Sequence, residues 1–355
     1  MSRSKAYIAL DAHARNCVLG WRNGRGEFRG FERFETSEKE LVEHVGQVPA
    51  DTKIVTVEES TLAAWVARTL HPWVQQIIVC NPRENPSVHQ DAFKNDGRDT
   101  EELSRLLWLG QLKGVYHPQD DSRAVFKALV RQYLDLRDTQ VRLKVQLKAK
   151  YHLWGVMQVS DTKQVYSAAG RQRYLSAIGD PVVQRQILRL YTLLDTALEQ
   201  EKEAYREMLA CGKRYPEIAE FMKIPGVGPV VSHVFDAFIQ TPERFPDKPT
   251  LWRYCQLAVT DRSSDNKPLG FRRLDKHGNP ELKSISYWAW KGAVRIRSRN
   301  EVKSFYAASL QRTHDKTHAR LNTQRKIIAT MWAIWRKGED YRPERFLSPA
   351  DAAER

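Results

Sequence analysis

The feature that most constrains the fold is a run of strand-like and helix-like segments in the first third of the chain. Three segments rich in β-forming residues come first, at 6–13, 16–23 and 27–35, and their close spacing predicts an antiparallel meander. Residues 36–48, 61–73 and 99–112 show helical periodicity, whereas 53–60 and 75–81 are apolar and strand-like. The resulting order, β-β-β-α-β-α-β-α, is that of the ribonuclease H fold.

Acidic residues occur where this fold can use them. Asp11 ends the first strand, Glu58 and Glu59 end the fourth, and Asp96 and Asp99 open the last helix on one face. Turn entry or helix capping explains each acid taken singly. Occurring together in this order, they predict a site for hard divalent cations, because bound metal offsets the repulsion between converging carboxylates. Mg²⁺ is the expected ion, with Mn²⁺ as a substitute.

The two adjacent glutamates compete for one place in this site. Consecutive strand residues point to opposite faces of a sheet, so either Glu58 or Glu59, but not both, can lie beside Asp11. The strand pattern does not choose between them.

From about residue 121 the periodicity changes to that of long helices. One apolar seam steps by three and four through Phe126, Leu129, Tyr133, Leu136, Gln140, Leu143 and Leu147, and a second through Ile187, Leu190, Leu194, Ala197, Glu201, Ala204 and Met208. The two seams predict an antiparallel coiled coil or a dimerising arm. Two helices of a compact bundle fit the pattern equally well.

The last third of the chain is basic. Residues 261–330 contain sixteen Lys and Arg but six Asp and Glu, within a chain of net charge +14, and such an excess is typical of a protein that binds a polyanion. The segment Ile224–Pro229, "IPGVGP", lies between two helical patterns. It resembles a helix-hairpin-helix turn, so Gly226 and Gly228 are candidates to contact nucleic-acid phosphates.

Cysteine usage and hydropathy indicate the compartment. The four cysteines are far apart and form no C-x-x-C pair, which argues against a disulfide framework and favours a reducing cytosol. No apolar run is long enough to span a bilayer. We therefore expect a cytoplasmic protein, associated with the nucleoid when active, that has no membrane partner.

Taken in order, these motifs resemble a family of bacterial insertion-sequence transposases that also includes a pilin-gene invertase. The resemblance rests on a DEDD signature (Asp11, Glu58, Asp96 and Asp99), on "IPGVGP", on "RSSDNK" and on "DKHGNPELK". In that family Glu58 would be the metal-site glutamate. The nucleophilic serine precedes a glycine, which maps it onto Ser264. Asp265 stands where that glycine is usual, so the choice between Ser263 and Ser264 stays open.

The resemblance implies a RuvC-like domain at 1–118, a coiled-coil arm at 119–214, a mainly helical serine domain at 215–347 and a tail at 348–355. It implies a recombinase whose Ser264 forms a phosphoserine link to DNA, with help from carboxylate-bound Mg²⁺. Relatives are guided by a structured bridge RNA that pairs with donor and target DNA. We expect a homo-oligomer, either a dimer or a tetramer built as a dimer of dimers. The candidate nucleic-acid contacts are Gly226, Gly228, Lys267, Arg272, Arg273, Lys276 and His277.

Two other functions fit the same residues. A junction-type nuclease would use the carboxylates and water, which would make Ser263 and Ser264 ordinary loop residues. A non-catalytic nucleic-acid-binding scaffold would need neither the serines nor the acids.

Overall fold

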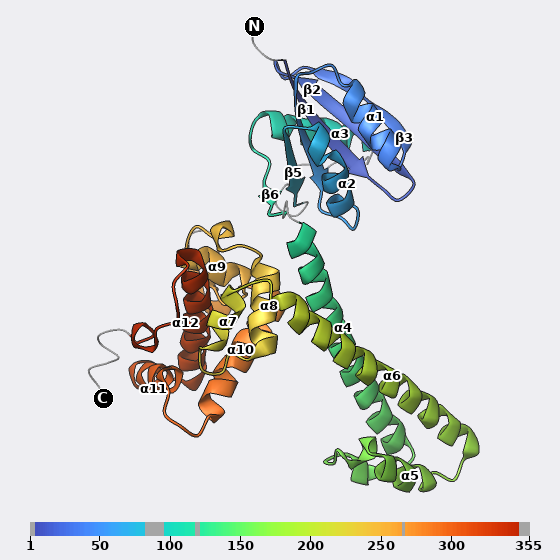
Figure 1. Ribbon diagram of the computed structural model, residues 1–355, viewed down its shortest axis with the longest axis vertical. Coiled ribbons are helices and arrows are strands. Elements are labelled where there is room, and N and C mark those ends of the chain that lie inside the picture. Colours follow the sequence, from blue (N-terminus) through green and yellow to red (C-terminus); the bar gives the residue numbers. More distant parts are fainter. Residues whose placement is uncertain (1–3, 82–95, 118–120, 265–266, 348–355) are drawn as a thin grey trace. The chain divides into compact units, whose positions relative to one another are not determined.

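The computed structural model describes residues 4–81, 96–117, 121–264 and 267–347, without the side chains of residues 96, 121, 260–264 and 267–272. The chain forms two compact units, Met1–Gln119 and Asp120–Arg355, of which the first is mixed α/β and the second mostly helical (Figure 1). No helix in these described ranges is long and apolar enough to cross a membrane.

The first unit is built on a six-stranded sheet of order β3-β2-β1-β4-β5-β6. Its strands are β1 (Lys5–Ala12), β2 (Asn16–Asn23), β3 (Phe28–Glu35), β4 (Thr52–Glu58), β5 (Gln76–Cys80) and β6 (Gly114–Val115). β1, β2 and β3 form the predicted antiparallel meander, and β4 is parallel to both β1 and β5. The two-residue β6, antiparallel to β5, was not predicted.

Helices cover both faces of this sheet. α1 (Glu38–Gln47) and α2 (Ala63–Leu70) pack with Leu41 and Val66 against a core that includes Leu10 and Val57. α3 (Asp96–Trp108) covers the other face, where Leu103 packs near Ala9 and Cys80. Period-2 alternation explains this division, because neighbouring residues of one strand face different helices.

The second unit begins with two long helices, α4 (Asp121–Leu153) and α6 (Pro181–Gly212), and α5 (Ala168–Ser176) lies between them in sequence. The start of α4 shares a core with the end of α6, and Leu147 of α4 shares another with Ile187, so the two helices run antiparallel (Figure 1). Both predicted seams are half-buried or buried throughout. A dimerising role for this arm stays a prediction.

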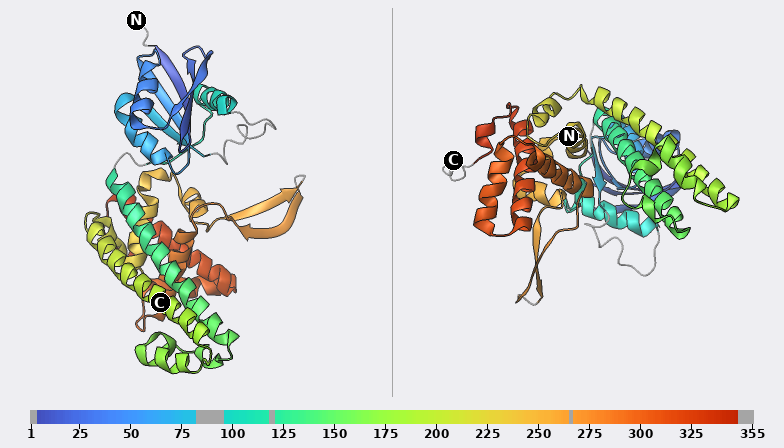
Figure 2. Two further views of the ribbon diagram at one scale, coloured as in Figure 1. Left: turned by 90° about the vertical axis from the view of Figure 1, so that its right-hand side faces the viewer. Right: turned by 90° about the horizontal axis from the view of Figure 1, so that it is seen from below.

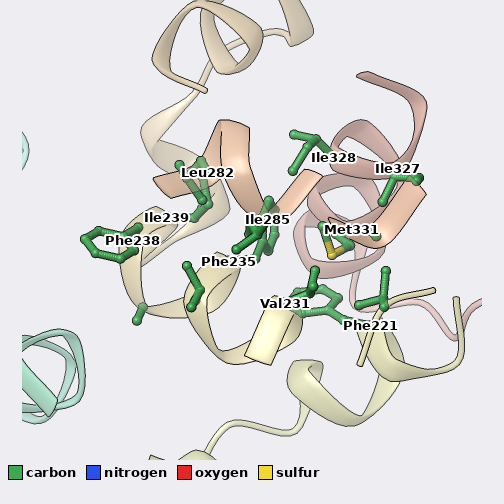
Figure 3. Packing of buried hydrophobic residues seen from close by; sticks show 14 of the residues in the cluster. Phe221, Val231, Phe235, Phe238, Ile239, Leu282, Ile285, Ile327, Ile328 and Met331 are labelled. Atoms are coloured by element: carbon green, nitrogen blue, oxygen red, sulfur yellow. The ribbon is translucent and has the colours of Figure 1, made fainter. Parts of the chain in front are cut away.

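The remaining helices form a compact body. They are α7 (Glu217–Met222), α8 (Pro229–Ile239), α9 (Lys248–Tyr254), α10 (Pro280–Arg295), α11 (Glu301–Thr313) and α12 (Lys316–Lys337). Short 3-10 turns occur in both units. The first unit has His71–Trp73, and the second has Met157–Val159, Gln164–Tyr166, Pro242–Arg244 and Pro343–Arg345. Phe221, Phe235, Ile285 and Met331 meet in the core (Figure 3), so α7, α8, α10 and α12 share one buried centre.

A β-hairpin interrupts this helical body. Its strands are β7 (Val259–Ser264) and β8 (Lys267–Leu274), which pair antiparallel and extend away from the helices (Figure 2). The sequence predicted a polar loop here, and that prediction was wrong for the described residues on both sides of the turn.

Candidate functional site

Asp11 and Glu58 lie near the carboxyl ends of β1 and β4, the two neighbouring strands at the centre of the first sheet. β1 and β4 are parallel, with Leu10 opposite Val57, so the next residues in register are Asp11 and Glu58. Leu10 and Val57 face α1 and α2, which places the two carboxylates on the opposite face, the one that α3 covers. Two acids therefore converge at the carboxyl ends of neighbouring parallel strands.

The register also distinguishes the two glutamates. Glu58 is half-buried, whereas Glu59 is exposed and follows the end of β4. Glu58 is the register partner of Cys80. Cys80 packs with Leu103 on the face that α3 covers. Glu58, not Glu59, is thus the glutamate on the side of Asp11.

α3 brings its first turn toward the same end of the sheet. Thr100 is fully buried against Gly20 of β2, where a Cβ would lie 2.6 Å from its Oγ1 atom. At the far end of the helix, the Trp108 indole donates to the Gly24 carbonyl at 3.4 Å. The helix therefore runs along β2 from Gly20 toward Gly24, with half-buried Asp99 in its first turn.

The expected metal site is not assembled among the described residues. No group of three His, Cys, Asp or Glu side chains that could hold a metal is assembled among them, and the side chain of Asp96 lies outside them. Asp11 is 18 % exposed, and its Oδ2 atom is 3.1 Å from His13 Nε2. Carboxylate oxygens at these strand ends suit Mg²⁺, so the donor chemistry fits the expected ion.

The two candidate serines sit at the far end of the hairpin. Ser263 pairs with Pro268 and Ser264 with Lys267, so both are the last residues of β7. Asp265 lies outside the described residues, as do the side chains of Ser263, Ser264, Lys267 and Arg272. The choice between the serines therefore stays a prediction.

The segment after the hairpin is an ordered connection to α10. Asp275 accepts hydrogen bonds from the backbone N–H and the Nδ1 atom of His277, at 2.8 and 2.7 Å, and these bonds hold the pKa of Asp275 below its usual value. Gly278 has φ +108° and approaches α9 so closely that a Cβ would lie 2.4 Å from the Tyr254 carbonyl. Asn279 caps α10 by accepting from the Glu281 N–H at 2.9 Å.

The basic candidates around this segment are open to solvent. Arg273, Lys276 and His277 are all exposed. Gly278 and Asn279, in contrast, pack against α9 and cap α10. Exposed cations on an ordered support are suited to phosphate contacts.

The "IPGVGP" turn joins α7 to α8 and packs on α10. Gly226 has φ +84°, and a Cβ there would lie 2.1 Å from the Ala289 carbonyl oxygen. Gly228 is the N-cap of α8 and has no atom within 4 Å of its would-be Cβ. Close packing therefore explains Gly226, while Gly228 lies beside the free N–H groups of the first turn of α8.

Replacing Gly226 by alanine is expected to lower the free energy of unfolding by about 2–4 kcal/mol, because a methyl group would strain φ and collide with the α10 backbone. Gly228→Ala is the matched control and should cost less than about 1 kcal/mol. Urea denaturation of both variants measures the difference. Equal, small losses would show that the close approach of the turn to α10 does not exist.

Sequence reasoning missed a buried ionic cluster. Arg123, near the start of α4, donates to Asp236 of α8 and, at 2.6 Å, to Glu217 of α7. Asp236 is fully buried, and burial raises its pKa well above the usual value while Arg123 opposes the rise. The signal in the sequence was a lone acid within the mostly apolar segment "VVSHVFDAFI".

Comparison with known proteins gives a family for part of the second unit. Residues 218–307 match the family model described as Transposase IS116/IS110/IS902 family. The matched segment includes the "IPGVGP" turn, the serine hairpin and the Asn279 cap of α10. No match was found among curated proteins. The match supports an insertion-sequence transposase.

Proposed function

We propose that the protein is a DNA transposase or site-specific recombinase of an insertion sequence that cuts and rejoins DNA through a phosphoserine intermediate. The observation that carries the proposal is the transposase family match over residues 218–307, which contains the hairpin that presents Ser264. The carboxylates of Asp11 and Glu58 follow the register pair Leu10 and Val57 in the first unit, and they would help to hold the divalent ion that assists the reaction.

We assign the first unit to a RuvC-like, ribonuclease H type of nuclease domain. In support, the strands follow the order β3-β2-β1-β4-β5 with an antiparallel meander and parallel β4 and β5, and the acids lie at the ends of β1 and β4. Asp11, Glu58, Asp96 and Asp99 would hold Mg²⁺ or Mn²⁺. The ion would offset negative charge that develops on the phosphate during reaction.

The serine supplies the covalent step. The Ser264 hydroxyl gives up its proton and its Oγ atom attacks a DNA phosphorus. The new Oγ–P bond makes the phosphoserine, while the bond from phosphorus to one deoxyribose oxygen breaks, and this oxygen takes up a proton and leaves as a hydroxyl. A hydroxyl of the other DNA strand then attacks the phosphoserine and releases Ser264. Because each phosphodiester exchanged is replaced by another ester, strands are rejoined without ATP.

The partners follow from charge and from the resemblance. The surplus of ten positive charges in residues 261–330 supports binding of donor and target DNA and of a structured guide RNA, with Gly228, Lys267, Arg272, Arg273, Lys276 and His277 as phosphate contacts. Gly226 shapes the turn that presents Gly228. A dimer or tetramer would allow the serine of one subunit to meet the carboxylates of another.

Replacing Asp11 or Glu58 by its amide is expected to reduce strand cleavage about 10²-fold or more, because a neutral amide binds the metal ion poorly. Asp11→Asn and Glu58→Gln should both show this loss, whereas Glu59→Gln, exposed and next in sequence, should cleave as the unchanged protein does. Cleavage of labelled element-end DNA with added Mg²⁺, and with EDTA as a metal-free control, measures it. A larger loss in Glu59→Gln than in Glu58→Gln would overturn the assignment of Glu58.

A further inference from the structure

A basic surface surrounds the end of α10 and belongs to none of the sites above. We call it the α10 basic surface, and it consists of Lys291, Arg295, Arg297, Arg299 and Arg320. Residues 295–299 are all exposed, and no acid occurs between Glu281 and Glu301. Within the described part of the chain, no ion pair neutralises Lys291, Arg295, Arg297 or Arg299, so the charge of these four is available to a partner. The fifth cation, Arg320, acts on the carboxylate of Asp315.

The loop that carries three of these arginines is held in one shape. Asn300 donates from its side chain to the Ala293 carbonyl at 3.1 Å and caps α11 by accepting from the Lys303 N–H at 2.9 Å. The Lys303 ammonium donates to the carbonyls of Ile296 and, at 3.2 Å, Ser298. Since the loop carbonyls are engaged by Lys303 and Asn300, the loop is ordered before any partner binds, which lowers the entropic cost of binding.

The cations continue along one stripe of α10. Tyr287, Lys291 and Arg295 are four residues apart and so share a helix face. The Arg320 guanidinium lies 5.7 Å from the ring centroid of Tyr287 and 5.9 Å from that of Trp290, and the Lys291 ammonium lies 5.6 Å from that of Tyr287. The rings thus hold cations in place.

This arrangement indicates the kind of nucleic acid that fits. Binding of unpaired bases needs aromatic faces on which the bases stack. The ring of Tyr287 already contacts Arg320 and Lys291, and the ring of Trp290 contacts Arg320. What the surface offers is a row of positive charges on an ordered support, which suits the regularly spaced phosphates of a duplex.

The "IPGVGP" turn packs on a different face of α10. The backbone of Gly226 crosses α10 at Ala289, Gly292 and Ala293, where a Cβ on Gly292 would lie 3.3 Å from the Gly226 Cα. Ala289 and Ala293 are buried, and their helical positions face away from the stripe of Tyr287, Lys291 and Arg295. The α10 basic surface is therefore separate from this turn.

We propose that the α10 basic surface binds the phosphate backbone of duplex DNA without reading its sequence, as a contact separate from the serine hairpin. The inference rests on the proposed function in taking DNA as the substrate. Beyond the proposed function, the inference says where on the fold the DNA binds, that the DNA is a duplex and not a single strand, and that binding does not depend on the base sequence.

The test is a charge-matched comparison in the full-length protein. Arg295→Gln, Arg297→Gln and Arg299→Gln are combined in one variant, and the control variant combines Arg142→Gln, Arg185→Gln and Arg189→Gln, which are exposed on α4 and α6. Both lose three positive charges. Fluorescence anisotropy then measures binding to duplexes of two unrelated sequences, to single-stranded DNA and to an RNA hairpin, over a range of salt, in EDTA to prevent cutting.

The α10 variant is expected to bind both duplexes about 10–100-fold more weakly at moderate salt, with the slope of log affinity against log salt reduced by about 2–3. The arm variant should change little, and a variant with lysines at the three positions should retain most of the affinity. Equal losses in both glutamine variants, or a larger loss for single strands or for RNA than for duplexes, would overturn the proposal. Because no cleavage is needed, the result is independent of whether a phosphoserine forms.

Discussion

Ser264→Ala is expected to abolish the covalent protein–DNA adduct and to lower strand exchange by at least about 10³-fold, because the variant has no oxygen to attack the phosphate. Labelled DNA that carries an element end, incubated with Mg²⁺ and then denatured, should remain attached to the unchanged protein and not to the variant. The backbone of Ser264 lies at the end of β7 beside the hairpin turn, so the substitution leaves the core of the helical body intact.

Ser263→Ala is the matched control, since it removes the same hydroxyl one residue earlier in the same strand. It should retain the adduct. Loss of the adduct in Ser263→Ala with retention in Ser264→Ala would exchange the roles of the two residues. Undiminished strand cleavage without an adduct by the double variant would instead favour a nuclease that uses water and the carboxylates, with the serines as ordinary hairpin residues.

Much of the first unit could be predicted from the sequence because its signals are local. β1, β2 and β3 begin and end within about two residues of their expected bounds, since alternating β-formers and short turns act over a few residues. β6 has two residues and leaves no periodic signal. The hairpin at 259–274 was read as a loop because its strands are polar, and the antiparallel pairing that stabilises them is not visible in composition.

The candidate site was predicted only in part for a similar reason. Asp11 and a glutamate at the end of β4 follow from strand position, and the family resemblance selects Glu58, with which the register of β1 against β4 agrees. The functional roles of these acids and of Ser264 stay predictions, and the side chains of Asp96 and Ser264 lie outside the described ones. The α10 basic surface depends on how Lys303 and Asn300 fold one loop, a detail that charge counting does not contain.

The Arg123 cluster shows the limit of local reasoning most clearly, because its members are about a hundred residues apart in sequence. Arg123→Met is expected to lower the free energy of unfolding by about 3–5 kcal/mol, since it leaves Asp236 and Glu217 with no cation. Arg131→Met is the control on the same helix. The side chain of Arg131 is 54 % exposed in its ion pairs, so its loss should cost less than about 1 kcal/mol.

The effect of Arg123→Met should also depend on pH. Burial already raises the pKa of Asp236, and without Arg123 that pKa rises further, so the folded variant keeps a proton that the unfolded chain releases. Stability is then favoured at acidic pH and falls as the pH rises above the unfolded value of an aspartate. Urea denaturation of Arg123→Met should therefore show a larger loss in the free energy of unfolding at neutral than at mildly acidic pH, and adding Asp236→Asn should recover part of that loss.

The opposite outcome is a loss that is the same at both pH values, with no recovery in the double variant. It would show that the cost comes from the stacking of Arg123 on Tyr215, whose ring centroid is 3.9 Å away, and not from the buried charge.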